Sequence, residues 1–78
     1  MYSNLPLTLL KEGEKAHVTT LLSSGSMRRR LQDLGIVNGT VIQCLQKSPN
    51  GDPTAYKIRG AIIALRSEDA NNIIVTHY

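Results

Sequence analysis

The sequence is poor in aromatic residues and in cysteine, and each shortage excludes a class of structure. The chain has three Tyr, no Phe and no Trp. The core must therefore be aliphatic, and the chain supplies ten Leu, seven Ile and four Val for it. The single cysteine, Cys44, excludes an internal disulfide and also a cysteine-based zinc site within one chain.

Long hydrophobic segments are missing as well. No apolar run approaches the roughly 18–20 residues that span a bilayer. The N-terminal stretch Met1–Leu10 lacks a basic start, and Pro6 and Thr8 interrupt its apolar residues, so it does not have the pattern of a secretory signal. We therefore expect a cytoplasmic protein. A chain of 78 residues and 8.6 kDa predicts one domain over residues 1–78.

The charge is mildly basic and unevenly spread. The formal net charge is +3, and the one cluster consists of Arg28, Arg29 and Arg30. This cluster is either a solvated helix face or a contact for an acidic partner, which could be protein or phosphate. Proteins that bind single-stranded nucleic acid stack bases on aromatic side chains. Few aromatics are present here, and two of them lie at or near the chain ends: Tyr2, Tyr56 and Tyr78. We expect no nucleic acid partner, and a small nucleic-acid-binding barrel remains an alternative.

Hydrophobic periodicity predicts short strands and one helix. Met27, Leu31 and Leu34 lie on one helical face, and Gly35 ends a helix of about ten residues. Leu5–Leu10 predicts a short strand or a helical turn. Five segments have strand composition: Ala16–Leu22, Thr40–Lys47, Thr54–Arg59, Ala61–Arg66 and Asn72–His77. The fold class is therefore mainly β, a small SH3-like barrel of about five short strands with one short α-helix, and an OB-like barrel is the alternative.

The sequence shows no pattern typical of catalysis. His17 and His77 are far apart and lie in no recognisable motif, and Cys44 among apolar strand neighbours indicates a core residue rather than a nucleophile. We therefore expect a protein that is not an enzyme, with no catalytic residues. No ligand spacing indicates a metal site, so no metal ligand and no certain cofactor are assigned, and weak binding of a transition metal is left open.

Four stretches together resemble the signature of the FeoA family, ferrous iron transport protein A. The first is Gly25–Thr40 (GSMRRRLQDLGIVNGT), and the next two are Ser48–Pro53 (SPNGDP) and Arg59–Arg66 (RGAIIALR). The fourth is the closing region with Glu68-Asp69-Ala70 and Ile74-Val75. The resemblance covers about residues 7–75, which we take as the core of one FeoA-like domain. One departure is Asn38, which stands where the family often has proline.

The resemblance implies an SH3-like barrel without catalytic activity. Members are small cytosolic proteins of bacterial ferrous iron uptake, thought to act on a membrane transporter whose cytosolic part is a GTP-binding domain. The same domain also occurs at the C-terminus of metal-dependent transcriptional repressors. The family is associated with transition-metal binding, so the resemblance implies ferrous iron as the metal that this chain could bind weakly. Applied to this chain, the resemblance predicts that the protein binds the GTP-binding region of the transporter and meets the membrane only through that partner.

Within this prediction, the motif residues divide into core and surface. We expect several of its apolar positions to supply core: Leu31, Leu34, Val41, Ile63 and Leu65. The residues assigned to partner binding are the arginines, which would meet carboxylates: Arg28, Arg29, Arg30, Arg59 and Arg66. Arg59 and Arg66 could instead pair internally with Asp33, Glu68 or Asp69. The oligomeric state is open, and an exposed edge strand such as Thr54–Arg59 could pair across a dimer.

Overall fold

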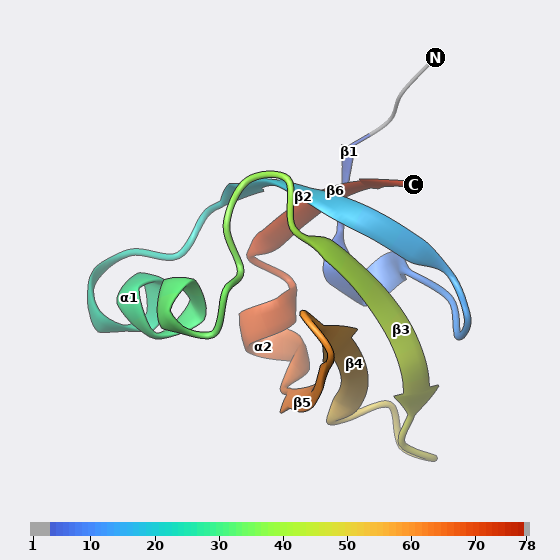
Figure 1. Ribbon diagram of the computed structural model, residues 1–78. Coiled ribbons are helices and arrows are strands. Elements are labelled where there is room, and N and C mark those ends of the chain that lie inside the picture. Colours follow the sequence, from blue (N-terminus) through green and yellow to red (C-terminus); the bar gives the residue numbers. More distant parts are fainter. Residues whose placement is uncertain (1–3, 78) are drawn as a thin grey trace.

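Six short strands form one antiparallel sheet in the computed structural model, which describes residues 4–77 (Figure 1). The strand order is β1-β6-β2-β3-β4-β5. In chain order the elements are β1 (Asn4–Pro6), the 3-10 turn η1 (Leu7–Leu9), β2 (Lys15–Leu21), α1 (Gly25–Asp33), β3 (Val41–Lys47), β4 (Thr54–Ile58), β5 (Ala61–Leu65), α2 (Ser67–Ala70) and β6 (Ile73–His77). The mainly β fold with one short helix, α1, is confirmed; α2 adds only four residues of helix, and the sheet has one strand more than the sequence predicted.

The additional strand comes from the N-terminal segment, where the sequence left strand and helical turn open. Both are present: β1 pairs with β6, with Asn4 opposite Thr76, and η1 follows directly. Pro6 is tolerated in β1 because this strand lies at the edge of the sheet. The edge strand expected at Thr54–Arg59 is wrong. β4 lies between β3 and β5, because the tight turn at Gly60 returns the chain as a hairpin, so the two edges are β1 and β5.

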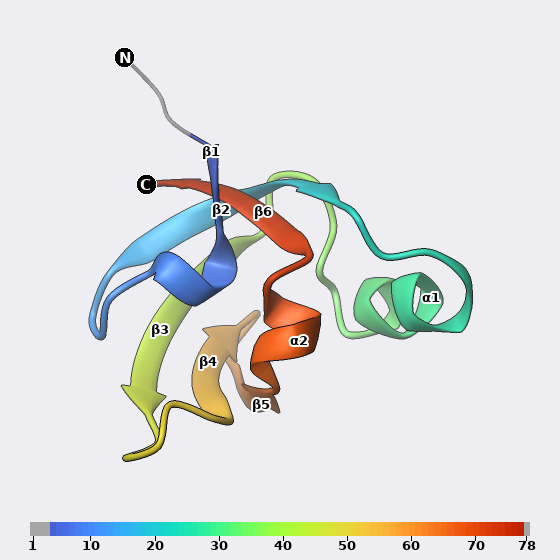
Figure 2. The ribbon, with the colours of Figure 1, turned by 180° about the vertical axis from the view of Figure 1, so that it is seen from behind.

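Two irregularities in strand register bend the sheet around its core. One lies in β2 between Val18 and Thr20, where it pairs with β6, and the other lies in β3 between Cys44 and Gln46, where it pairs with β4. An extra residue on one strand of an antiparallel pair increases the local twist and bends that strand. The sheet therefore curls, as the view from behind shows (Figure 2). This arrangement agrees with the SH3-like barrel that the sequence predicts.

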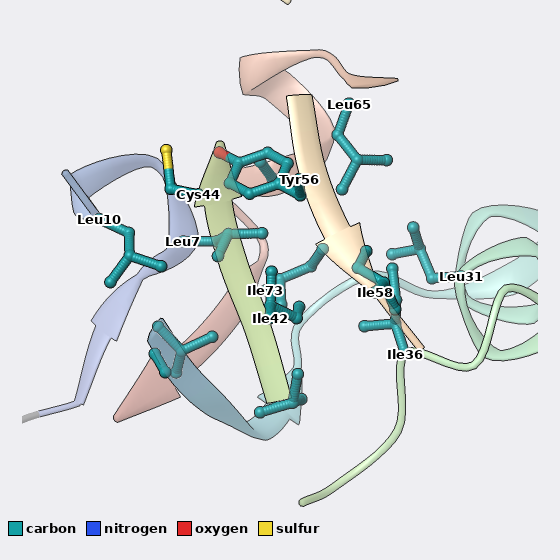
Figure 3. Close-up of a cluster of buried hydrophobic side chains, with 14 of the residues drawn as sticks. Leu7, Leu10, Leu31, Ile36, Ile42, Cys44, Tyr56, Ile58, Leu65 and Ile73 are labelled. Carbon is teal, nitrogen blue, oxygen red and sulfur yellow. The ribbon is translucent and has the colours of Figure 1, made fainter. Parts of the chain in front are cut away.

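The core is aliphatic, as the composition requires. Leu7 and Leu10 lie at one end of the cluster, and Leu31 and Ile36 lie beside Ile58 at the α1 end (Figure 3). Each of these side chains is almost fully buried. Burying one such side chain contributes roughly 1.5–3 kcal/mol, so the segments flanking the sheet are held mainly through these contacts.

Cys44 and Tyr56 face each other across β3 and β4 inside the barrel. Cys44 is fully buried, which confirms it as a core residue, and burial raises the pKa of its thiol. Burial also raises the pKa of Tyr56 to about 12. The core assignment of Val41 is wrong: the alternation of β3 turns Ile42 and Cys44 inward, so Val41 points outward and is 39% exposed.

The C-terminus of α1 is closed by the glycine that the sequence singled out. Gly35 has φ +91°, and its N–H donates to the carbonyl of Gln32 at 2.9 Å. The N–H of Ile36 donates to the carbonyl of Leu31 at 3.0 Å. These two hydrogen bonds, together with apolar packing between Leu31 and Ile36, form the Schellman motif. It anchors α1, because both Leu31 and Ile36 are buried in the core.

Candidate partner-binding surface

α1 projects to one side of the sheet, on the opposite side from η1 (Figures 1 and 2). Its three adjacent arginines are exposed. Consecutive residues of an α-helix are about 100° apart around its axis, so these three side chains fan over the helix instead of sharing one stripe. The structure therefore confirms their exposure but separates their directions.

Arg28 makes a contact within the fold that its two neighbours do not share. Its Nη1 donates to the carbonyl oxygen of Leu21, the last residue of β2, at 2.9 Å. This bond ties the first turn of α1 to the end of β2. Arg29 and Arg30 remain exposed on the helix surface. Among the arginines of α1, these two are therefore the better candidates for a partner contact.

A hollow of about 280 Å³ lies where α1 meets β2. Arg28 and Gln32 line it from the helix, and Val37 and Asn38 line it from the loop that follows. Nδ2 of Asn38 donates to the carbonyl of Thr19 at 3.0 Å. Asparagine at this position thus fixes the loop with a side-chain bond in place of the ring that proline would supply.

Two exposed apolar side chains lie near Arg28, one before α1 and one after it. Leu22 follows β2 and is 63% exposed, and Val37 is partly exposed at the rim of the hollow. We call the set of Leu22, Arg28, Arg29, Arg30 and Val37 the helix face. The sequence did not indicate where an apolar contact would lie, because Leu22 is next to a strand that buries Leu21 and its own exposure depends on where that strand ends.

Arg59 has a structural role that the sequence did not reveal. It forms the β4–β5 turn with Gly60 and has φ +50°. Its Nε donates to the carbonyl oxygen of Gly35 at 3.2 Å, and the same oxygen accepts a bond from Oγ1 of Thr40 at 2.7 Å. Arg59 therefore joins the turn to the end of α1.

Arg66 is exposed just after β5, at the opposite end of this strand from Arg59. The internal ion pairs that the sequence allowed for Arg59 and Arg66 are not formed within residues 4–77. Over that range the ion pair present is between Nε2 of His77 and Oε1 of Glu14, at 3.6 Å. The five arginines therefore do not gather at one place, and their assignment to a partner stays a prediction.

The strands bring together cations that lie far apart in the sequence. Lys15 lies opposite Gln43, and Gln43 lies opposite Lys57, in one row across β2, β3 and β4. These residues line a hollow of about 200 Å³ with Val41, Arg59 and Gly60. The sequence alone does not indicate this group. Its only signal is the alternation within each strand, and pairing the lysines requires the register between strands.

Nothing in the described part of the chain assembles a metal site. No three side chains among His, Cys, Asp and Glu cluster within residues 4–77. Over the same residues, no helix is long and apolar enough to cross a membrane.

Comparison with known proteins gives consistent matches. A family model described as FeoA domain matches residues 5–77. A Porphyromonas gingivalis protein, the Fe(2+) transport protein A/Fe(2+) transporter FeoB fusion protein, is 35% identical over 69 residues. These residues are 88% of this chain and 8% of the fusion protein, so the chain spans a small part of that relative.

Solved structures of other proteins have the same fold as this chain. The FeoA-like protein of Clostridium acetobutylicum has a TM-score of 0.86 at 35% identity, covering 96% of this chain and 87% of its own. The Stenotrophomonas maltophilia FeoA has a TM-score of 0.80 at 27% identity, covering 88% of this chain and 86% of its own. That protein was solved in complex with zinc and is described as a prokaryotic SH3 domain protein. Because the FeoA domain model matches residues 5–77, nearly the whole of this chain, the chain belongs to the FeoA family.

Proposed function

We propose that this chain is a non-catalytic, cytoplasmic partner of a ferrous iron membrane transporter and binds that transporter's cytosolic GTP-binding region. The fusion relative carries the proposal, because its name joins Fe(2+) transport protein A and the transporter FeoB in one polypeptide. Covalent joining holds two modules at high effective concentration, which is of use when the two act together. The choice of the GTP-binding region rests on the family resemblance.

The helix face is the surface proposed for this contact. An exposed ion pair contributes only about 0–1 kcal/mol, so Arg29 and Arg30 alone would give weak binding. Fully burying a leucine side chain contributes roughly 1.5–3 kcal/mol. Leu22 follows Leu21, whose carbonyl oxygen accepts the bond from Arg28, and the Leu22 side chain is largely exposed. We therefore assign most of the affinity to Leu22 and assign orientation and association rate to the arginines.

The test measures the affinity of this chain for the purified GTP-binding region of the transporter from the same organism by isothermal titration calorimetry. The region is loaded with GDP in one series and with a non-hydrolysable GTP analogue in the other. Leu22→Ala should weaken binding about tenfold, which corresponds to roughly 1.4 kcal/mol. Leu9→Ala is the matched control, because Leu9 is equally exposed at 63% and lies in η1.

Charge is tested separately with Arg29→Glu and Arg30→Glu. Each should lower the affinity about fivefold at low salt and less at high salt. Lys11→Glu changes the net charge equally and lies outside the helix face, so it should leave the affinity unchanged. If Leu22→Ala and Leu9→Ala bind alike, the assignment to the helix face is wrong. If the unmodified chain does not bind in either nucleotide state, the choice of the GTP-binding region is wrong.

A metal-responsive module is the second candidate, favoured by the zinc complex of the Stenotrophomonas maltophilia relative. A metal that binds the folded state raises the melting temperature in proportion to the logarithm of its concentration. The candidate predicts such a rise with zinc and with manganese, the latter as a stable substitute for ferrous iron. An unchanged melting temperature at millimolar metal would exclude it.

A further inference from the structure

The outward surface of β3, β4 and β5 carries two hollows that lie along the same strand. In β4 the side chains of Thr54, Tyr56 and Ile58 point into the core, and the alternate residues Ala55 and Lys57 point outward. Ala55 lines one hollow and Lys57 lines the other. We call this outward surface, with both hollows, the strand face.

The hollow at the Lys57 end is cationic. Three of its six lining residues are positively charged, namely Lys15, Lys57 and Arg59, and none carries a carboxylate among the residues that the structure describes. Lys15 and Lys57 are two strands apart in one row, so their backbones are separated by about 10 Å. Two long side chains at this spacing can converge on one or two carboxylates. Exposed Val41 gives the same hollow an apolar border.

Four of the seven residues that line the hollow at the Ala55 end are apolar, and the other three are Gln46, Lys47 and Ser48. Pro49 and Pro53 enter it from the β3–β4 loop, and Ala55 and Ala64 form its floor on the two strands. Its volume is about 280 Å³, and the short alanine side chains are what leave this space open. Ile62, on the edge strand β5, pairs with Lys57 and is 71% exposed. It adds a further apolar side chain to the outward surface of the sheet.

We propose that the strand face binds an extended, acidic segment of another protein, with an apolar side chain in the alanine hollow and carboxylates against Lys15, Lys57 and Arg59. Charge complementarity carries the inference, because the cationic hollow holds three positive side chains without an acid of its own. Ala55 and Arg59 are four residues apart, about 13 Å along the strand direction, which is the length of a four- to five-residue extended segment.

Two other occupants fit the strand face less well. A second copy of this chain would bring like charges together, because each copy presents the same lysines and arginine. Single-stranded nucleic acid needs exposed aromatic rings for stacking. Tyr56, the tyrosine that lies within residues 4–77, is 1% exposed, so its ring is closed to a base. The inference goes beyond the proposed function, since it concerns a different surface and does not require the transporter.

The experiment titrates the isotope-labelled full chain with synthetic peptides and follows its amide NMR signals. Two nine-residue peptides carry two valines at one end and three glutamates at the other, in opposite orders, because the direction of the segment is open. We expect one order to bind more tightly and to shift the signals of β4, β5 and the β3–β4 loop. Peptides with lysine in place of glutamate should not bind.

Variants separate the two hollows. Lys57→Glu should weaken the peptide roughly five- to tenfold, because it replaces an attraction with a repulsion, whereas Lys11→Glu, with the same charge change outside the strand face, should not. Ala64→Gln fills the alanine hollow with a polar group and should weaken binding severalfold. The amide spectrum of each variant reports whether it is folded before any peptide is added.

Three results would overturn the inference. The first is the absence of shifts at millimolar concentration of both acidic peptides. The second is a set of shifts confined to α1, which would place the acidic contact on the helix face. The third is a shift of the strand-face amide signals on addition of a ten-nucleotide oligothymidine, with no shift on addition of the acidic peptides. That result would assign this surface to nucleic acid.

Discussion

Replacing Gly35 by alanine tests the contact that joins the end of α1 to the β4–β5 turn. Gly35 has φ +91°, and an added Cβ would lie 2.6 Å from Cδ and 2.8 Å from Nε of Arg59. The arginine would have to move, and the bond from its Nε to the Gly35 carbonyl would be lost. Gly39 is the matched control, because its φ is +90° and an added Cβ would meet no atom within 4 Å.

The difference between the two variants isolates the Arg59 contact. A left-handed backbone costs a residue with a side chain about 1–2 kcal/mol relative to glycine, and this cost applies to both positions. Gly35→Ala additionally loses a hydrogen bond, which contributes about 0.5–1.5 kcal/mol. We therefore expect a loss of about 2–3 kcal/mol for Gly35→Ala. The difference of about 1 kcal/mol between the variants corresponds to roughly 4–8 °C in melting temperature for a chain of this size.

Urea unfolding followed by circular dichroism measures the free energy of unfolding of each variant, alone and in combination with Arg59→Ala. In the Arg59→Ala background, Gly35→Ala should cost no more than Gly39→Ala, because the obstructing side chain and its bond are already gone. Equal losses for Gly35→Ala and Gly39→Ala with Arg59 present would refute the reasoning. So would an extra cost of Gly35→Ala that persists without Arg59.

Three further predictions concern acid stability, the thiol and the core. The pKa of Glu14 is lowered, chiefly by the bond its carboxylate accepts from the N–H of Lys11, so its contribution is present above its ordinary value of 4.5 and is lost as pH falls through the lowered pKa. Glu14→Gln should flatten the urea midpoint against pH below about pH 4.5, and an unchanged slope would contradict this. Burial raises the pKa of the Cys44 thiol, so at neutral pH Ellman's reagent should react at least roughly 100-fold more slowly with the folded chain than with the urea-unfolded chain; similar rates would show that the thiol is accessible. Ile73→Ala should cost about 2–5 kcal/mol in urea unfolding, against less than about 0.5 kcal/mol for exposed Ile62→Ala, and equal losses would place the core elsewhere.

Local patterns in the sequence predicted those parts of the fold that depend on near neighbours. The helix follows from the apolar spacing of Met27, Leu31 and Leu34, and its end follows from Gly35 and Ile36, which form the expected bonds. The first strand could not be predicted with the same assurance. Asn4–Pro6 is only three residues long, and it becomes a strand by pairing with β6 at the other end of the chain.

The candidate surfaces depended still more on distant pairing. The arginines of α1 were recognisable as exposed, because they are charged residues off the apolar face of a helix. The hydrogen bond of Arg59 to Gly35 joins residues 24 positions apart, and no local pattern announces it. The row of Lys15, Gln43 and Lys57 likewise exists only through the register of three strands. Val41 was assigned to the core for the same reason: it is a β-branched residue in a strand, and the sequence alone does not show which residues of that strand point inward.

The most direct test of the proposed function is an NMR titration of the labelled chain with the GTP-binding region of the transporter, in the GDP state and with a GTP analogue. We predict that the amide signals of Leu22, Arg29, Arg30 and Val37 shift or broaden in at least one nucleotide state, while that of Leu9 does not. Unchanged signals in both states, or changes confined to η1 and β1, would contradict it.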